Sequence, residues 1–299
     1  MSCTKSYRAA LMDEPTNLED TPKRIRLDLR LIHEIPELSR SFGTKLIQNG
    51  KVAVNGEVID KPGYKLWPYD ELEVDYDKSI LDIIPDIELP IIYEDGDCVA
   101  IDKPTGVLTH TKGRLQPEAT VATWLRRRIH NMTGDRAGIV HRLDRATSGV
   151  MICAKHPAAL KLLQKQFENR TAKKTYLAVV SGMVTPDKAI IDLPIERNPK
   201  APATFRVGAS GKDAQTRYEV VKFGKDTTLL ELHPATGRTH QLRVHLAHIS
   251  HPILGDPLYG KSDARLYLHS YQLSLTLPNG TKKTFTSQAP TSFEKVLGL

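Results

Sequence analysis

The chain has 299 residues, of which 40% are hydrophobic and 26% are charged, as in a folded globular protein long enough for two domains. Its formal net charge of +7 favours an acidic or polyanionic partner. No segment reaches the roughly 18 consecutive apolar residues of a membrane span, and the N-terminus lacks the apolar run of a secretory signal. The three cysteines lack metal-ligand spacing, which argues against a disulfide scaffold or a zinc ribbon. We therefore expect a cytoplasmic protein that does not bind a membrane.

The N-terminal region divides into a leader and a compact unit. Residues 1–22 are polar and show no sustained periodicity, so we expect a flexible leader. Within residues 23–79, an amphipathic helix is predicted to begin in the segment 26–32 and to be interrupted by Pro36. Ser39 is a plausible N-cap for a second helix.

A small sheet should complete this unit. Asn55 and Gly56 stand between two short β-prone runs within residues 52–59, which predicts a tight hairpin, and residues 72–74 predict a third strand. Residues 23–51 contain seven basic and three acidic side chains, so the helices should present a basic face. Such a face suits a nucleic-acid backbone, because lysine and arginine displace counterions from phosphate. The solvated surface of a small domain could have the same composition.

These segments resemble the αL RNA-binding domain, which was first recognised in a small-subunit ribosomal protein. The resemblance is carried by residues 26–28, 38–41 and 46–56. It implies RNA binding through Arg40, Lys45 and Lys51, and it does not indicate what is done to the RNA.

A linker and a larger unit follow. Residues 80–90 contain Pro85 and Pro90 among mixed acidic and apolar residues, so we expect an extended linker. Residues 91–299 mix helical and alternating patterns, which predicts one α+β domain. The predicted strands are 91–93, 98–101, 173–180, 216–223, 228–233 and 266–277. The predicted helices are 118–132, one beginning at Pro157, and one that starts in 236–239 with Thr239 as its N-cap.

Residues 141–149, His-Arg-Leu-Asp-Arg-Ala-Thr-Ser-Gly, form the most unusual segment of the chain. Asp144 stands between Arg142 and Arg145, in a polar stretch with apolar runs on both sides. The pattern predicts a loop between two buried strands, ending in small residues that let a backbone or a ligand approach closely. Asp144 could form a structural salt bridge or belong to a functional site, and this segment alone does not distinguish the two.

Known catalytic patterns exclude several chemistries. His240, His245, His248 and His251 lie close together in the sequence, but no carboxylate or cysteine accompanies them at metal-ligand spacing, so no metal is expected. The zinc-deaminase pattern, the phosphate-binding P-loop and the Gly-x-Ser-x-Gly elbow are all missing from the sequence. What remains is an isolated carboxylate, Asp144, which can act as a nucleophile or as a base if a nearby arginine keeps it ionised.

Segment 141–149 resembles the active-site motif of the RluA-type pseudouridine synthases. Four further segments resemble motifs of that family, in the family's order: 102–106, 174–179, 237–245 and 251–256. The resemblance implies an α+β fold, with a mixed, largely antiparallel sheet, flanking helices and an RNA-binding cleft. It also implies an isomerase that detaches uracil from its ribose, turns it and reattaches it through carbon five, without a metal or a redox cofactor.

The motif positions imply a role for each of several residues. Asp144 is the catalytic aspartate, which attacks the sugar or the base or abstracts a ribose proton. Tyr176 is expected to stack on the uracil and is a candidate general base. Arg243 is expected to pair with Asp144 and hold it ionised. Leu268 should line the uracil pocket, and Arg142 is the candidate to fill the gap that the extruded base leaves.

Other predictions concern the substrate. Arg238 and His240 are expected to bind it, Arg238 through phosphate, while Arg126–Arg128 could contact RNA or form a solvated helix face. An αL domain also precedes this fold in the members that modify large-subunit ribosomal RNA, so that RNA is the expected partner, bound by a monomer. A transfer-RNA pseudouridine synthase and a non-catalytic ribosome-assembly protein are the alternatives. The presence of all three catalytic residues argues against a loss of activity.

Overall fold

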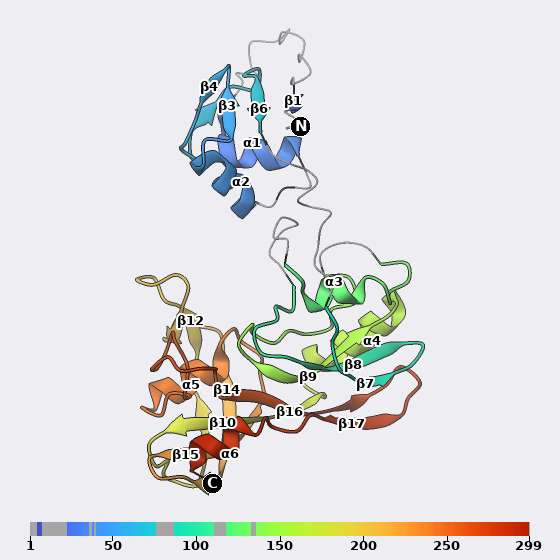
Figure 1. Cartoon of the computed structure of the whole chain (residues 1–299), viewed down its shortest axis with the longest axis vertical. Coiled ribbons are helices and arrows are strands. Elements are labelled where there is room, and N and C mark those ends of the chain that lie inside the picture. The colour runs from blue at the N-terminus through green and yellow to red at the C-terminus, as the bar shows by residue number, and fades with distance from the viewer. Residues whose placement is uncertain are drawn as a thin grey trace. The chain divides into compact units, whose positions relative to one another are not determined.

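The computed structural model of the chain describes residues 5–7, 23–35, 38, 40–75, 87–110, 118–132 and 136–298. The chain divides into two compact units, residues 1–86 with 110–119 and residues 87–109 with 120–299 (Figure 1). No helix in the described ranges is long and apolar enough to cross a membrane.

Two helices and a small sheet form the N-terminal unit. The helices are α1 (Leu27–Glu34) and α2 (Arg40–Gln48), and the sheet has the strand order β1 (Lys5–Tyr7), β6 (Leu72–Val74), β3 (Val52–Val54), β4 (Glu57–Val58). A separate pair joins β2 (Ile25–Arg26) to β5 (Lys65–Leu66). Both helices lie beside the sheet (Figure 1). Leu31, Ile47 and Val52 lie in one buried core, which joins the apolar faces of the helices to the sheet.

The predicted hairpin is confirmed. Asn55 and Gly56 have φ angles of 52° and 81°, the left-handed values that a two-residue turn between twisted strands requires. Strand β6 pairs with β3 and also with β1, so residues 5–7 are not part of a flexible leader as predicted. These three residues have no hydrophobic pattern, and their strand depends on backbone bonds to an edge of β6 that is distant in the sequence.

The predicted linker is only partly described. Ser39 and residues 80–86 lie outside the described residues. Residues 87–90, also predicted to be linker, belong to the second unit, where Leu89 is buried beside Val99 in a core cluster. The second unit therefore begins before the predicted residue 91.

One large sheet organises the second unit (Figure 1). Its strand order is β11 (Lys188–Asp192), β14 (Gln215–Phe223), β15 (Thr227–Pro234), β10 (Lys173–Ser181), β16 (Leu268–Thr276), β9 (Ser148–Ala154), β8 (Cys98–Lys103), β7 (Ile91–Glu94), and β17 (Lys282–Thr286) pairs with β16. Every pairing is antiparallel except that of β16 with β9. Strands β12 (Ile195–Arg197) and β13 (Phe205–Val207) form a separate hairpin. The predicted mixed, largely antiparallel α+β fold is confirmed.

The parallel pair β9–β16 lies at the centre of this sheet and depends on one glycine. Gly149 has a φ of 110°, and a Cβ built on it would overlap the carbonyl oxygen of Ser270 on β16. The chain can therefore pass from the loop at 141–147 directly into a fully buried strand. A strand is also expected before the loop. There, Ile139 forms only an isolated antiparallel bridge to Cys153 on β9, and no named strand.

Four helices flank the sheet: α3 (Val121–Leu125), α4 (Pro157–Glu168), α5 (Gln241–His248) and α6 (Ser292–Leu297). Helix α4 begins at Pro157 as predicted, and its Leu163 is fully buried. The predicted helix 118–132 is wrong in length, because Thr120 and Thr123 form a capping box and the backbone turns more tightly after Leu125.

Helix α5 begins later than predicted. Its N-cap is His240, with a left-handed φ of 56°, and not Thr239. The preceding loop is tied instead by the buried side chain of Gln241, whose Oε1 accepts hydrogen bonds from the Thr236 hydroxyl and the Arg238 backbone N–H. His240 itself makes no side-chain capping hydrogen bond, so Gln241, the first residue of α5, holds the loop in place of an N-cap side chain.

Candidate active site

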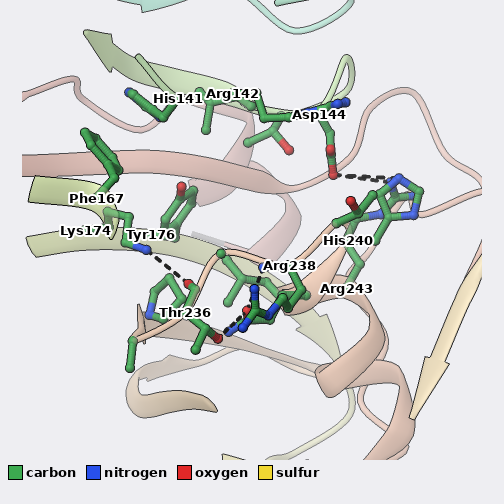
Figure 2. Close-up of a pocket in the computed structure, with 18 of the residues that line it drawn as sticks. His141, Arg142, Asp144, Phe167, Lys174, Tyr176, Thr236, Arg238, His240 and Arg243 are labelled. Carbon is green, nitrogen blue, oxygen red and sulfur yellow. Dashed lines mark hydrogen bonds and ion pairs between the residues drawn. The ribbon is translucent and has the colours of Figure 1, made fainter. Parts of the chain in front are cut away.

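A cavity of about 510 Å³ opens between strands β10 and β16, the loop 141–147 and the loop that precedes α5 (Figure 2). It brings together every residue predicted to be catalytic or substrate-binding: Asp144, Tyr176, Arg243, Arg142, Leu268, Arg238 and His240. These residues come from four separate segments of the chain, so their convergence depends on the fold.

Two side chains of a neighbouring segment, Lys103 and Thr109, hold the backbone around Asp144. The hydroxyl of Thr109 donates to the Leu143 carbonyl oxygen at 2.8 Å and accepts from the Leu143 N–H at 3.2 Å. The ammonium of Lys103, which is fully buried, donates to three backbone carbonyls, among them that of Arg145 at 3.3 Å. Burial lowers the pKa of Lys103 to about 8, and the charge of Asp144 opposes that shift. The aspartate is therefore presented by a rigid loop.

Arg243 contacts Asp144, but its short ion pair is with another carboxylate. Its Nη1 lies 3.8 Å from Asp144 Oδ2, whereas its Nε and Nη2 donate to the two oxygens of Asp256 at 2.7 Å each. Asp256 is fully buried. Burial favours neutral forms of both partners, yet the bidentate pair raises the pKa of Arg243 and lowers the pKa of Asp256. Arg243 therefore lies within ion-pair distance of Asp144, as expected, but its closest partner is Asp256.

His240 approaches the same carboxylate oxygen as Arg243. Its Nε2 lies 3.9 Å from Asp144 Oδ2, and its Nδ1 lies 2.8 Å from the hydroxyl oxygen of Tyr259. That oxygen already accepts the N–H of Phe205 at 2.9 Å, so its own proton is best placed to donate to Nδ1. Burial lowers the pKa of His240, which favours the neutral ring. The remaining ring proton then sits on Nε2 and points toward Asp144.

Tyr176 and Leu268 line the cavity on the side of the sheet. They lie on the adjacent strands β10 and β16, where Tyr176 is opposite Ser270. Burial raises the pKa of Tyr176 to about 12, the Ser270 hydroxyl opposes this shift, and the charge of Asp144 adds to it. The phenol is therefore neutral near pH 7. This state fits the predicted stacking role directly, whereas a tyrosinate base would be scarce.

Two predicted substrate-binding arginines lie at the margin of the cavity. Arg142 is exposed. Arg238 donates from its Nε to the Asp213 carbonyl oxygen at 2.9 Å, so one face of its guanidinium is held by the protein. Both remain cations on the lining of a cavity that already contains Arg243, and such a cluster suits a polyanion.

Two of the histidines that follow His240, His245 and His251, have structural partners. His245 lies within 2.9 Å of both the Thr216 hydroxyl and the Leu193 carbonyl oxygen, and His251 lies 2.9 Å from the Ser181 carbonyl oxygen. Among the residues the structure describes, no group of three or more histidine, cysteine or acidic side chains could hold a metal ion.

The predicted RNA-binding residues of the N-terminal unit are all exposed at least in part. Arg40 and Arg26 both bind the carboxylate of Asp28, at 2.8 and 2.9 Å between the closest atoms, so one positive charge is left over. These arginines hold the pKa of Asp28 below its usual range, against its burial. Lys51 pairs with Asp75 at 2.7 Å, which offsets part of its charge, while Lys45 is exposed on α2.

Comparison with known proteins agrees with this geometry. Residues 97–248 match the family described as RNA pseudouridylate synthase, and residues 26–72 match the S4 domain. The chain is 41% identical over 243 residues to an uncharacterized RNA pseudouridine synthase of Aquifex aeolicus (strain VF5), which covers 79% of this chain and 77% of that protein. It is 35% identical over 289 residues to the ribosomal large subunit pseudouridine synthase D of Borreliella burgdorferi, which covers 90% of this chain and 87% of that protein.

A solved structure shows the same fold. The chain matches human RNA pseudouridylate synthase domain containing 4 with a TM-score of 0.57 and 26% identity, over 70% of this chain and 92% of that one. Fold, site and relatives together define an RNA-modifying isomerase. The chain belongs to the pseudouridine synthase family, of the RluA type, with an RNA-binding S4 domain at its N-terminus.

Proposed function

We propose that this enzyme isomerises uridines of large-subunit ribosomal RNA, with Asp144 as its catalytic carboxylate. The observation that carries the chemistry is the single cavity in which Asp144, Tyr176 and Arg243 meet. The choice of RNA is supported by the name of the Borreliella relative, and binding to RNA is supported by the excess of basic residues in segment 23–51.

The reaction is an exchange of one bond for another within the same nucleotide. The bond from ribose C1′ to N1 of the base breaks, the base turns, and a bond from C1′ to C5 forms. The hydrogen on C5 leaves as a proton, and N1 gains a proton, so no atom or electron is gained overall. Asp144 has to be ionised to act as a nucleophile or as a base. The contact with Arg243 at 3.8 Å stabilises that negative charge and leaves the carboxylate available to react.

The other side chains prepare the base for this exchange. Tyr176 offers a neutral aromatic face on which the extruded uracil can stack, and Leu268 supplies an apolar wall. Taking a base out of a helix costs a few kcal/mol, which Arg142 at the cavity margin can offset by filling the gap. The buried pair of Arg243 with Asp256 keeps the guanidinium in place before RNA binds.

The test is to map pseudouridines by carbodiimide modification in ribosomal and transfer RNA from a strain that lacks the gene. We expect at least one pseudouridine to disappear from large-subunit ribosomal RNA and to return with the wild-type gene, but not with Asp144→Asn. Loss confined to transfer RNA would contradict the choice of substrate. Persistence of every pseudouridine in both RNAs would contradict the function itself.

A further inference from the structure

The cavity has a second charged end that the roles assigned above leave unused. Lys174 lines it, on strand β10 two residues before Tyr176, and Phe167, Glu168 and Arg170 line the same region. Figure 2 shows Lys174 beside Phe167, with Tyr176 between it and Asp144 in this view. Residues two apart on a strand project from the same face, roughly 7 Å from each other along the strand.

The ammonium of Lys174 has little compensation from the protein. It donates one hydrogen bond, to the Thr236 carbonyl oxygen at 3.0 Å, although an ammonium carries three donors. In the described part of the chain no ion pair joins Lys174 to a carboxylate, Glu168 included. A half-buried cation in this setting is costly unless a ligand brings the counter-charge.

The groups around Lys174 favour an anionic ligand. Burial lowers the pKa of Lys174 to about 8, and a second positive charge, on Arg170, adds to this shift. His141 stacks on Phe167 with ring centroids 4.5 Å apart, and burial together with the charge of Lys174 lowers its pKa to about 3, so it contributes no charge. Tyr176 is neutral as well.

We propose that Lys174, together with Arg170, binds a phosphodiester group of the substrate RNA near the target uridine. This inference rests on the proposed placement of the uracil on Tyr176 and of its sugar at Asp144. Lys174 lies at the other end of the cavity from Asp144, so the phosphate belongs to RNA beside the extruded nucleotide and not to the reacting ribose. A phosphodiester is the group of RNA that carries negative charge, and its two non-bridging oxygens can accept hydrogen bonds from both cations. The cavity of about 510 Å³ leaves room for more than one base.

The hydrogen bond from Lys174 to Thr236 connects the proposed phosphate subsite, Lys174 and Arg170, to the end of the cavity that contains Asp144. The loop that carries Thr236 also carries Arg238 and leads into His240. A phosphate held by Lys174 therefore fixes the RNA against the same loop that borders Asp144. Lys174 acts as a binding and positioning residue and takes no part in bond exchange.

The experiment uses the full-length protein and total RNA, labelled with tritium at C5 of uridine, from cells that lack the gene. Release of tritium reports the reaction whichever RNA contains the target. The variants are Lys174→Met, Lys174→Arg and, as a matched control, Lys173→Met, which removes one charge from the adjacent exposed residue on the opposite face of β10. Thermal unfolding of each variant shows that it is folded.

We expect Lys174→Met to lower kcat/KM by about ten- to one-hundred-fold, mainly through KM, because a charge-assisted hydrogen bond to phosphate is lost. Lys173→Met should stay within about three-fold of the wild type, because its side chain is exposed on the face of β10 opposite Lys174. The slope of log kcat/KM against log salt should become shallower by about 0.7–0.9 in Lys174→Met, the value for one phosphate contact. Lys174→Arg should restore most of the activity.

The pH profile separates a charged contact from a structural one. As pH rises from 7 to 9, wild-type Lys174 loses its proton while arginine at this position keeps its charge, so kcat/KM relative to Lys174→Arg should fall up to about ten-fold. Dividing by the Lys174→Arg profile cancels the titration of Lys103, which both proteins share. A constant ratio, an unchanged salt slope, or equal effects of Lys174→Met and Lys173→Met would overturn the subsite. Absence of tritium release by the wild type would instead contradict the synthase function.

Discussion

The buried pair of Arg243 and Asp256 makes a quantitative prediction for the substitution Asp256→Asn. The substitution keeps the size of the side chain but removes its charge and turns an N–H group toward Arg243. The 2.7 Å hydrogen bond from Arg243 Nε to Oδ2 is lost, and the 2.7 Å bond from Nη2 to Oδ1 keeps only a neutral acceptor. The guanidinium, of which only 5% of the side chain is exposed, is left without a close counter-charge. Breaking a buried ion pair costs about 3–5 kcal/mol.

We expect a value near the lower limit, about 3 kcal/mol, for this particular substitution. Asparagine keeps one oxygen that can still accept the backbone N–H groups of Leu258 and Tyr259, now 2.9 and 3.2 Å from Asp256 Oδ1. The assay is urea unfolding of the second unit, followed by the fluorescence of the buried Trp124 in a Trp67→Phe background. Because Trp67 lies in the N-terminal unit, its removal leaves a probe of the second unit alone.

A matched pair at the surface provides the control. Arg206 and Glu196 also approach to 2.7 Å, but half of the Arg206 side chain is exposed, so Glu196→Gln should cost no more than about 1 kcal/mol. A cost below about 1 kcal/mol for Asp256→Asn would refute the reasoning, because the buried pair would then be no stronger than the exposed one.

The same pair predicts how stability depends on pH. Because the folded pKa of Asp256 lies below its unfolded value of about 3.9, its contribution is fully present above that value and is lost as pH falls through the folded pKa. The difference in unfolding free energy between wild type and Asp256→Asn should therefore be constant from about pH 5 to 8 and shrink below about pH 4. A difference that grows in acid would contradict this assignment.

Three further variants test the catalytic loop, the central strand pair and the N-terminal unit. Thr109→Val removes two hydrogen bonds to the backbone of the catalytic loop and should cost about 1–3 kcal/mol in urea unfolding and lower kcat; unchanged values would show that the loop holds itself. Gly149→Ala should destabilise the second unit by about 3 kcal/mol or more, since its Cβ overlaps the Ser270 carbonyl; a normal melting temperature would contradict that. Lys45→Gln with Lys51→Gln should weaken RNA binding and reduce its log–log salt slope by up to about 2, as measured by filter binding; an unchanged slope would remove both from the RNA interface.

Local features of this fold were predictable because each depends on neighbouring residues. The turn at Asn55 and Gly56 needs left-handed backbone, which those two residue types allow, and Pro157 fixes the start of α4. The motif at 141–149 identified the cavity, since the family resemblance supplied the distant residues that local patterns could not connect.

Contacts between distant segments could not be predicted in the same way. Asp256 neutralises Arg243 through a pairing that only the folded chain creates, although it lies in one of the recognised motifs. Thr109 holds the Asp144 loop across 34 residues of sequence, and nothing in its local pattern marks it. Strand β1 is three residues long and joins a sheet edge formed far along the chain, so its pairing has no sequence period to reveal it.

The most direct test of the central claim compares Asp144→Asn with the wild type on the same labelled RNA. Asparagine keeps the shape of the side chain and removes its charge, and Asp144 has no close ion pair whose loss would unfold the protein. The account predicts RNA affinity within about three-fold of the wild type, because no phosphate contact is lost, and no detectable release of tritium from C5 of uridine. Tritium release by Asp144→Asn at a rate comparable to that of the wild type would contradict the assignment of Asp144 as the catalytic carboxylate.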